Sequence, residues 1–81
     1  MIPMRNEKTQ PAVITKEPKL SVRELEVLQL MANGKSSKTI ALELFISTNT
    51  IEAHRKQILK KLEAKNMAEA ISIAFRKEII H

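Results

Sequence analysis

One stretch constrains this chain more than any other: Ser47 to Leu62, which reads STNTIEAHRKQILKKL. Ser47 is a strong helix N-cap, because its hydroxyl can accept a hydrogen bond from a free backbone N–H of the first turn. Ile51, Ile58 and Leu62 then recur at helical spacing and form one apolar stripe. The stretch therefore predicts a helix with an apolar back, which a small core can hold, and a basic front.

The front of this predicted helix carries the side chains that could contact a ligand. The residues that share it are Asn49, Glu52, Ala53, Lys56 and Lys60, with Arg55 at its edge. Lys56 and Lys60 lie one turn apart, flanked by Arg55 and Lys61, and such cations pair with phosphate or with O6 and N7 of guanine. The major groove of B-form DNA admits an α-helix. The front is thus a candidate DNA interface, and a solvated basic face is the alternative.

Two front residues have more than one interpretation. Glu52 could accept from N4 of cytosine, stabilise the helix dipole in the first turn, or pair with Lys56 one turn later. Thr50 could cap the helix locally, bind a phosphate, or do both.

Size and composition narrow the class of protein. The chain has 81 residues, which indicates one domain, and a net charge of +5, which favours an anionic partner. Cysteine is absent, which excludes disulfides and Cys-based zinc or iron–sulfur sites. The aromatics are two phenylalanines, so stacking platforms for single strands are lacking and duplex DNA is favoured over RNA. No apolar window is long enough to span a membrane, and the N-terminus lacks a signal-peptide pattern, so we expect a cytoplasmic protein with no membrane partner.

The sequence divides into two parts. Residues 1–19 hold all three prolines and no sustained period, and we interpret them as a disordered N-terminal arm or linker. Residues 20–81 show helical periods throughout and no strand pattern. We therefore expect an all-α domain, a four-helix bundle that contains a helix-turn-helix, over residues 20–81.

Start and stop signals place the first two helices. Ser21 and Glu24 form an S-x-x-E capping box at the start of the first helix. Gly34 ends that helix, because it can adopt the left-handed conformation. Ser36 caps the second helix, which is short and runs to Leu44. The turn that joins this helix to the stretch at Ser47 contains no glycine.

The last helix follows a second capping-box-like pair, Asn66 and Glu69. Its apolar face leaves several isoleucines at the edge, among them Ile73, Ile79 and Ile80. Either these side chains cover the first helix or they form a surface for a partner. We favour a dimer contact, and the residues that we assign to it are Ile73, Arg76, Lys77 and Ile80.

No arrangement of residues indicates an enzyme. No nucleophile–base–orienter set is apparent, and a Gly-rich phosphate loop is impossible with one glycine. His54 and His81 are the histidines, too few to suggest a metal site. We expect no catalytic residue, no metal and no cofactor.

Residues 20–75 also resemble a known pattern, the DNA-binding domain of the LuxR/FixJ/NarL family of bacterial transcription regulators. The matched features in this chain are Leu20-Ser21, Arg23-Glu24, Glu26-Val27-Leu28, Ala32, Gly34, Ser36, Lys38, Ile40-Ala41, Leu44, Ile46-Ser47, Thr50-Ile51, His54, Ile58 and Lys61-Leu62. The resemblance implies a four-helix domain whose third helix enters the major groove and whose fourth carries the dimer contact.

The resemblance also implies roles for individual residues. Positions that face base edges in related proteins are here Glu52, Ala53 and Lys56. Positions where phosphate contacts are plausible are here Lys38, Thr50, Arg55 and Lys60. The partners so implied are a double-stranded, pseudo-palindromic promoter site, a second copy of the chain on DNA, and RNA polymerase as a further candidate.

Three departures from the family pattern bear on these roles. Glu52 stands where many relatives have lysine, which affects base preference. Glu63 replaces a common glycine, so the turn before the last helix is expected to be strained. Met67 replaces a common arginine, so an ion pair found in relatives is expected to be absent.

The alternative function is a helical protein-interaction module that uses the isoleucine-rich last helix.

Overall fold

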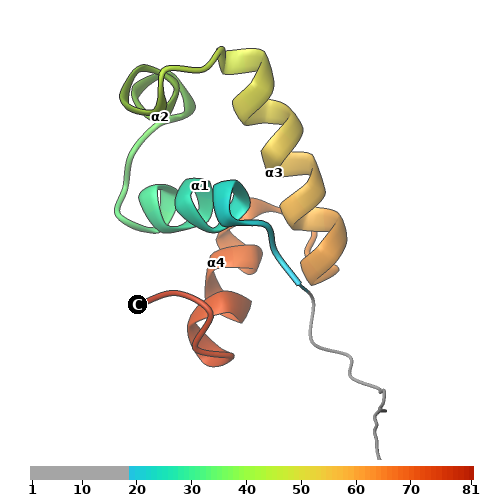
Figure 1. Cartoon of the computed structure of the whole chain (residues 1–81). Coiled ribbons are helices and arrows are strands. Elements are labelled where there is room, and N and C mark those ends of the chain that lie inside the picture. Colours follow the sequence, from blue (N-terminus) through green and yellow to red (C-terminus); the bar gives the residue numbers. More distant parts are fainter. Residues whose placement is uncertain (1–18) are drawn as a thin grey trace, which may run out of the picture.

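A computed structural model describes residues 19–81. It contains the helices α1 (Val22–Ala32), α2 (Ser37–Leu44), α3 (Thr48–Leu62) and α4 (Met67–Arg76) (Figure 1). This part of the chain has no strand, so the predicted all-α, four-helix architecture is confirmed. All but the last residue of the predicted arm, residues 1–19, lies outside the described residues.

Each helix starts at the capping residue that the sequence predicted. The side-chain oxygens of Ser21, Ser36, Ser47 and Asn66 each accept a hydrogen bond from the backbone N–H three residues later. At α1 the bond is reciprocal, because the Glu24 carboxylate accepts from the N–H of Ser21 at 2.9 Å. One of the free N–H groups at each helix start is therefore satisfied locally, and the caps mark where each helix begins.

A residue with a left-handed backbone also follows each helix within two positions. The φ angles are 91° at Gly34, 59° at Phe45, 54° at Glu63 and 58° at Glu78. In each case the N–H of the following residue donates to the carbonyl five positions earlier, which closes the helix end. Glycine is the residue that tolerates this conformation, so Phe45, Glu63 and Glu78 each carry a strain of roughly 1 kcal/mol.

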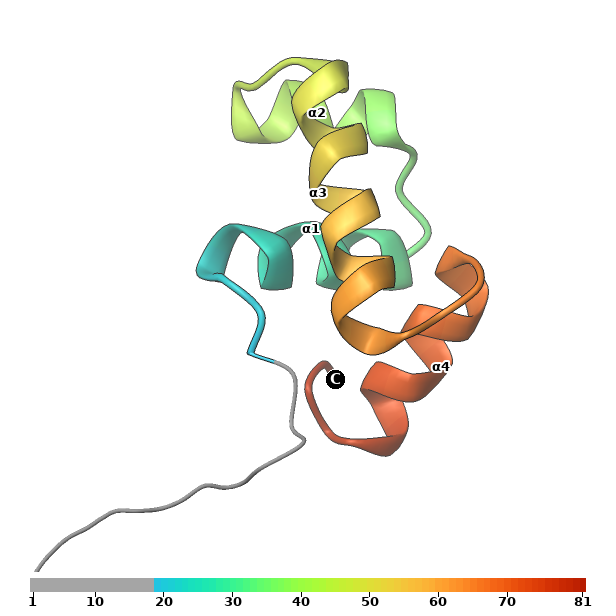
Figure 2. The same cartoon turned by 90° about the vertical axis from the view of Figure 1, so that its right-hand side faces the viewer.

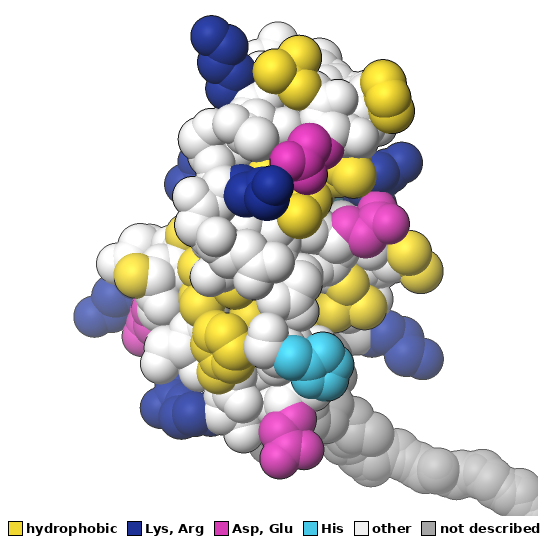
Figure 3. Space-filling view, turned by 90° about the vertical axis from the view of Figure 1, so that its left-hand side faces the viewer, with side chains coloured by type: hydrophobic (Ala, Val, Ile, Leu, Met, Phe, Trp, Pro, Cys, Tyr) yellow, Lys and Arg dark blue, Asp and Glu magenta, His cyan; other side chains and the backbone are white. Residues whose placement is uncertain are grey.

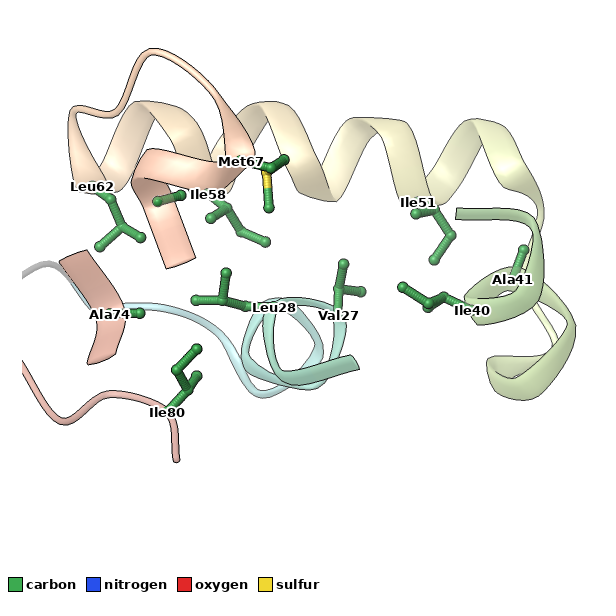
Figure 4. Close-up of a cluster of buried hydrophobic side chains, with 11 residues drawn as sticks. Val27, Leu28, Ile40, Ala41, Ile51, Ile58, Leu62, Met67, Ala74 and Ile80 are labelled. Atoms are coloured by element: carbon green, nitrogen blue, oxygen red, sulfur yellow. The ribbon is translucent and has the colours of Figure 1, made fainter. Parts of the chain in front are cut away.

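The core is one continuous cluster between α3 and the other helices. Val27 and Leu28 of α1 point toward α3, Ile40 of α2 meets Ile51 at one end, and Leu62 lies at the other end (Figure 4). Burying an apolar side chain of this size contributes about 1.5–3 kcal/mol. α3 therefore supplies a large part of the core, and the core in turn holds α3 in position.

The C-terminal residues fold back over α1. Ile80 is only 3% exposed and belongs to the core cluster. The side-chain amide of Gln29 donates to the carbonyl oxygen of His81 at 3.0 Å and accepts from its N–H at 3.1 Å. Of the two alternatives for the C-terminal isoleucines, Ile80 takes the intramolecular one, because burial against α1 removes its apolar surface from water. In this fold Ile80 is not available to the dimer contact that we assigned to it.

The face turned away from α3 is hollowed between α1, the end of α2 and the C-terminal residues (Figure 3). Apolar side chains gather on this face among acidic and basic ones, and Leu25, Leu44 and Ile79 line the hollow.

Among residues 19–81, no helix combines the length and the apolar content that crossing a bilayer requires.

Candidate nucleic-acid interface

α3 lies across α1 and α2 on one side of the molecule, with its full length on the surface (Figure 2). Its predicted apolar stripe is observed, since Ile51 and Ile58 are fully buried and Leu62 is 6% exposed. The helix has 15 residues and is about 22 Å long at 1.5 Å per residue. It is thus fixed from behind by the core and open to solvent in front.

The outward face of α3 matches the predicted front. Asn49, Ala53, Lys56 and Lys60 are exposed and follow one another at intervals of three or four residues. Gln57 is also exposed beside them, although it was not among the residues predicted for the front. Its position four residues after Ala53 was the available signal, and a glutamine amide can pair with the N6 and N7 groups of adenine.

Three lysines on this side of the molecule lack acidic partners among the described residues. Lys56 and Lys60 of α3 and Lys38 of α2 are exposed, and within residues 19–81 none of them forms an ion pair. By contrast, Lys35 binds Glu43 at 2.7 Å on the surface. A set of uncompensated cations on one helix face is an electrostatic footprint suited to a polyanion.

Arg55 is placed differently from the two lysines. Its side chain is 33% exposed, and Nη1 donates both to Oγ of Ser37 at 3.2 Å and to Oε2 of Glu52 at 3.3 Å. Arg55 therefore lies between α2 and α3, at the edge of the outward face. For Glu52, the observed partner is Arg55, and no ion pair with Lys56 is present among the described residues.

Thr50 is exposed and already has a local partner. Its backbone N–H donates to Oγ of Ser47 at 3.0 Å, and the two hydroxyl oxygens lie 2.9 Å apart. Ser47 is thus the residue that caps α3, and the Thr50 side chain hydrogen-bonds to the hydroxyl of that cap. Its exposed hydroxyl stays at the N-terminal end of α3, where helix N–H groups attract anions.

Lys61 does not extend the basic face as its sequence position suggested. Its Nζ lies 2.8 Å from Oε1 of Glu24, a carboxylate that is almost fully buried. Burial raises the pKa of Glu24, but the hydrogen bonds from Lys61 and from the N–H of Ser21 outweigh that effect, so the pKa is lowered from its ordinary value of 4.5. The pair joins the start of α1 to the end of α3 and so helps to set the angle of α3.

The remaining assigned residues lie on α4 or directly follow it. Ile73 is half-buried, whereas Arg76 and Lys77 are exposed near the end of the helix. Met67, which replaces a common arginine, is 8% exposed and packs in the core. Within residues 19–81, no group of three or more histidine, aspartate or glutamate side chains is close enough to hold a metal ion.

Comparison with known proteins gives one family. The model described as "Bacterial regulatory proteins, luxR family" matches residues 18–74. Oxygen regulatory protein NreC from Staphylococcus haemolyticus (strain JCSC1435) is 42% identical over 77 residues, which cover 93% of this chain and 36% of that protein. The uncharacterized transcriptional regulatory protein YvfU from Bacillus subtilis (strain 168) is 49% identical over 61 residues, 75% of this chain and 30% of that protein. The chain thus spans about a third of the length of these curated relatives.

Solved structures give the same result for the fold. The transcription factor GerE superposes with a TM-score of 0.74 at 31% identity, over 76% of this chain and 92% of that chain. The response regulator ChrA of a heme-sensing two-component system gives a TM-score of 0.74 at 39% identity, over 76% of this chain and 31% of that chain.

Proposed function

Because this chain belongs to the luxR family of bacterial regulatory proteins, as a helix-turn-helix output domain of a transcription regulator, we propose that it binds double-stranded DNA sequence-specifically through α3. In this proposal the outward face of α3 lies in the major groove. The observation that carries it is the exposed row on α3, in which Lys56 and Lys60 have no acidic partner in residues 19–81. Regulatory-family membership also agrees with the expectation that the domain is no enzyme.

The exposed residues divide into two kinds of contact. The groups proposed to meet base edges are Asn49, Glu52, Ala53 and Lys56, because they lie on or beside the outward face of α3. The groups proposed to meet phosphates are Lys38, Thr50, Arg55 and Lys60, which flank that face. Phosphate contacts fix the register of the helix on the duplex, and base contacts select the sequence.

A homodimer on DNA is the second part of the proposal. Since Ile80 is buried, we assign the contact to Ile73 and Arg76 of α4 and to Lys77 directly after it. A two-fold dimer would read a pseudo-palindromic promoter site with a fixed spacing between half-sites. RNA polymerase is a candidate further partner of the bound dimer. Replacing Ile73 by Asp should abolish two-half-site complexes in native gels while single-site binding survives.

The function test is a selection of bound duplexes from a randomised library, followed by fluorescence anisotropy on the selected site at several salt concentrations. We expect a defined site, and an affinity that falls by a log–log slope of about 0.9 per phosphate contact. Failure to enrich any duplex, or binding that is insensitive to salt, would overturn the proposal. Capture of a protein partner by α4 without DNA binding would instead favour the interaction module.

A further inference from the structure

One acid stands among the cations of the outward side. The Glu52 side chain is 47% exposed and lies on α3, one turn before Arg55 and Lys56. A carboxylate that faces a duplex is repelled by the negative charge of the phosphates. Its position there is unfavourable unless a nearby cation neutralises it and a base N–H donates a hydrogen bond to it. The structure supplies the cation in Arg55.

Arg55 is itself held from a second helix. Its Nη1 donates to Oε2 of Glu52 at 3.3 Å and to Oγ of Ser37, the first residue of α2, at 3.2 Å. The Arg55 side chain is two-thirds covered, which restricts its rotamers. Ser37 is not the N-cap of α2, because Ser36 has that role. The hydroxyl of Ser37 is therefore free to serve the guanidinium without loss of the helix cap.

We propose that Ser37 and Arg55 are positioning residues that fix the Glu52 carboxylate as a specificity-determining acceptor for N4 of cytosine. This inference rests on the proposed function. Arg55 neutralises one carboxylate oxygen and orients the group, and the other oxygen, which has no partner among residues 19–81, receives the base donor. The same carboxylate oxygen would be repelled by O6 and N7 of guanine, which are also acceptors. Glu52 therefore selects the base at one position of the site, and Ser37 of α2 holds Glu52 in place through Arg55.

The test is a double-mutant cycle on the site that the wild-type chain selects. Binding is measured on that duplex and on the three duplexes that change the base pair facing Glu52, for Ser37→Ala, Glu52→Ala and the double variant. Glu52→Ala should remove a preference of about 5- to 100-fold at that base pair. Ser37→Ala should reduce the same preference by about 2- to 10-fold. Ser72→Ala, on the exposed side of α4, is the control and should leave the preference unchanged.

The inference predicts that Ser37→Ala has no further effect on base preference once Glu52 is alanine. Equal effects in both backgrounds, or a uniform loss of affinity for all four duplexes, would overturn it and leave DNA binding intact. An unchanged preference in Glu52→Ala would also overturn it. If the wild-type chain selects no duplex at all, the proposed function itself has failed, and this inference fails with it.

Discussion

Oε1 of Glu24, near the start of α1, lies 2.8 Å from Nζ of Lys61, in the last turn of α3. The same oxygen accepts from the N–H of Ser21 at 2.9 Å. The Glu24 carboxylate thus completes the capping box of α1 and also holds the C-terminal end of α3, the helix proposed to face DNA. The angle of α3 and the stability of α1 therefore depend on the same charge.

Glu24→Gln should lower the free energy of unfolding by about 2 kcal/mol at pH 7, because the ion pair is lost from a mostly buried site. The pKa of Glu24 is depressed in the fold, so its contribution is full above the ordinary value of 4.5 and is lost as pH falls through the folded value. Urea unfolding between pH 3 and 7 measures this. The difference between the two proteins should shrink in acid.

The control for that prediction is Glu26→Gln. Glu26 pairs with Arg23 on the surface, with both side chains over 40% exposed, so the change should cost well under about 1 kcal/mol. Equal losses for the two variants, or a difference that does not depend on pH, would contradict the role given to Glu24.

Glu63→Gly should stabilise the domain by about 0.5–1 kcal/mol. Glu63 ends α3 with a φ of 54°, and glycine removes that strain, although it also raises the entropy of the unfolded chain. Thermal unfolding measures the change. Lys65→Gly, in the same turn without a positive φ, serves as the matched control and should destabilise the domain. A loss of stability in Glu63→Gly would show that its backbone is not strained.

Local signals predicted much of this fold. The N-caps at Ser21, Ser36, Ser47 and Asn66 act within three residues, so the sequence alone could place the helix starts. Left-handed helix ends are predictable where glycine supplies them, and Glu63 was expected to be strained by comparison with related sequences. Nothing local marked Glu78 as such a residue.

Tertiary contacts limited what the sequence could predict of the site. Lys61 looked like part of the basic face, yet its partner Glu24 is 37 positions away in the chain. Ile80 had two plausible places, and its burial occurs where the C-terminal residues meet α1, with hydrogen bonds between Gln29 and His81, which are 52 positions apart. The spacing of Lys56 and Lys60 on one helix face was a local pattern, and the structure places both in solvent.

Ile80→Ala should cost about 2–4 kcal/mol of stability, because it opens a cavity beneath the C-terminal residues. Ile73→Ala is the matched control, since Ile73 is half-buried, and it should cost about 1 kcal/mol. Chemical denaturation of both variants makes the comparison. If Ile80→Ala were the milder change, and if it instead weakened assembly on DNA, Ile80 would belong to the dimer contact after all.

Lys60→Ala should reduce the salt dependence of DNA binding by one phosphate contact, a change in the log–log slope of about 0.9. Lys65→Ala removes an equal charge from an exposed position beyond the end of α3 and should change the slope less. Anisotropy titrations at four salt concentrations give both slopes. Identical slopes for the two variants would mean that overall charge, and not the face of α3, attracts the duplex.

The most direct test is an NMR titration of the isotope-labelled chain with the selected duplex. The account predicts that the largest chemical-shift changes fall on the outward face of α3, at Asn49, Ala53, Lys56 and Lys60, and on Lys38 of α2. Changes confined to α4, or to the hollow beside the C-terminal residues, with α3 unaffected, would contradict it.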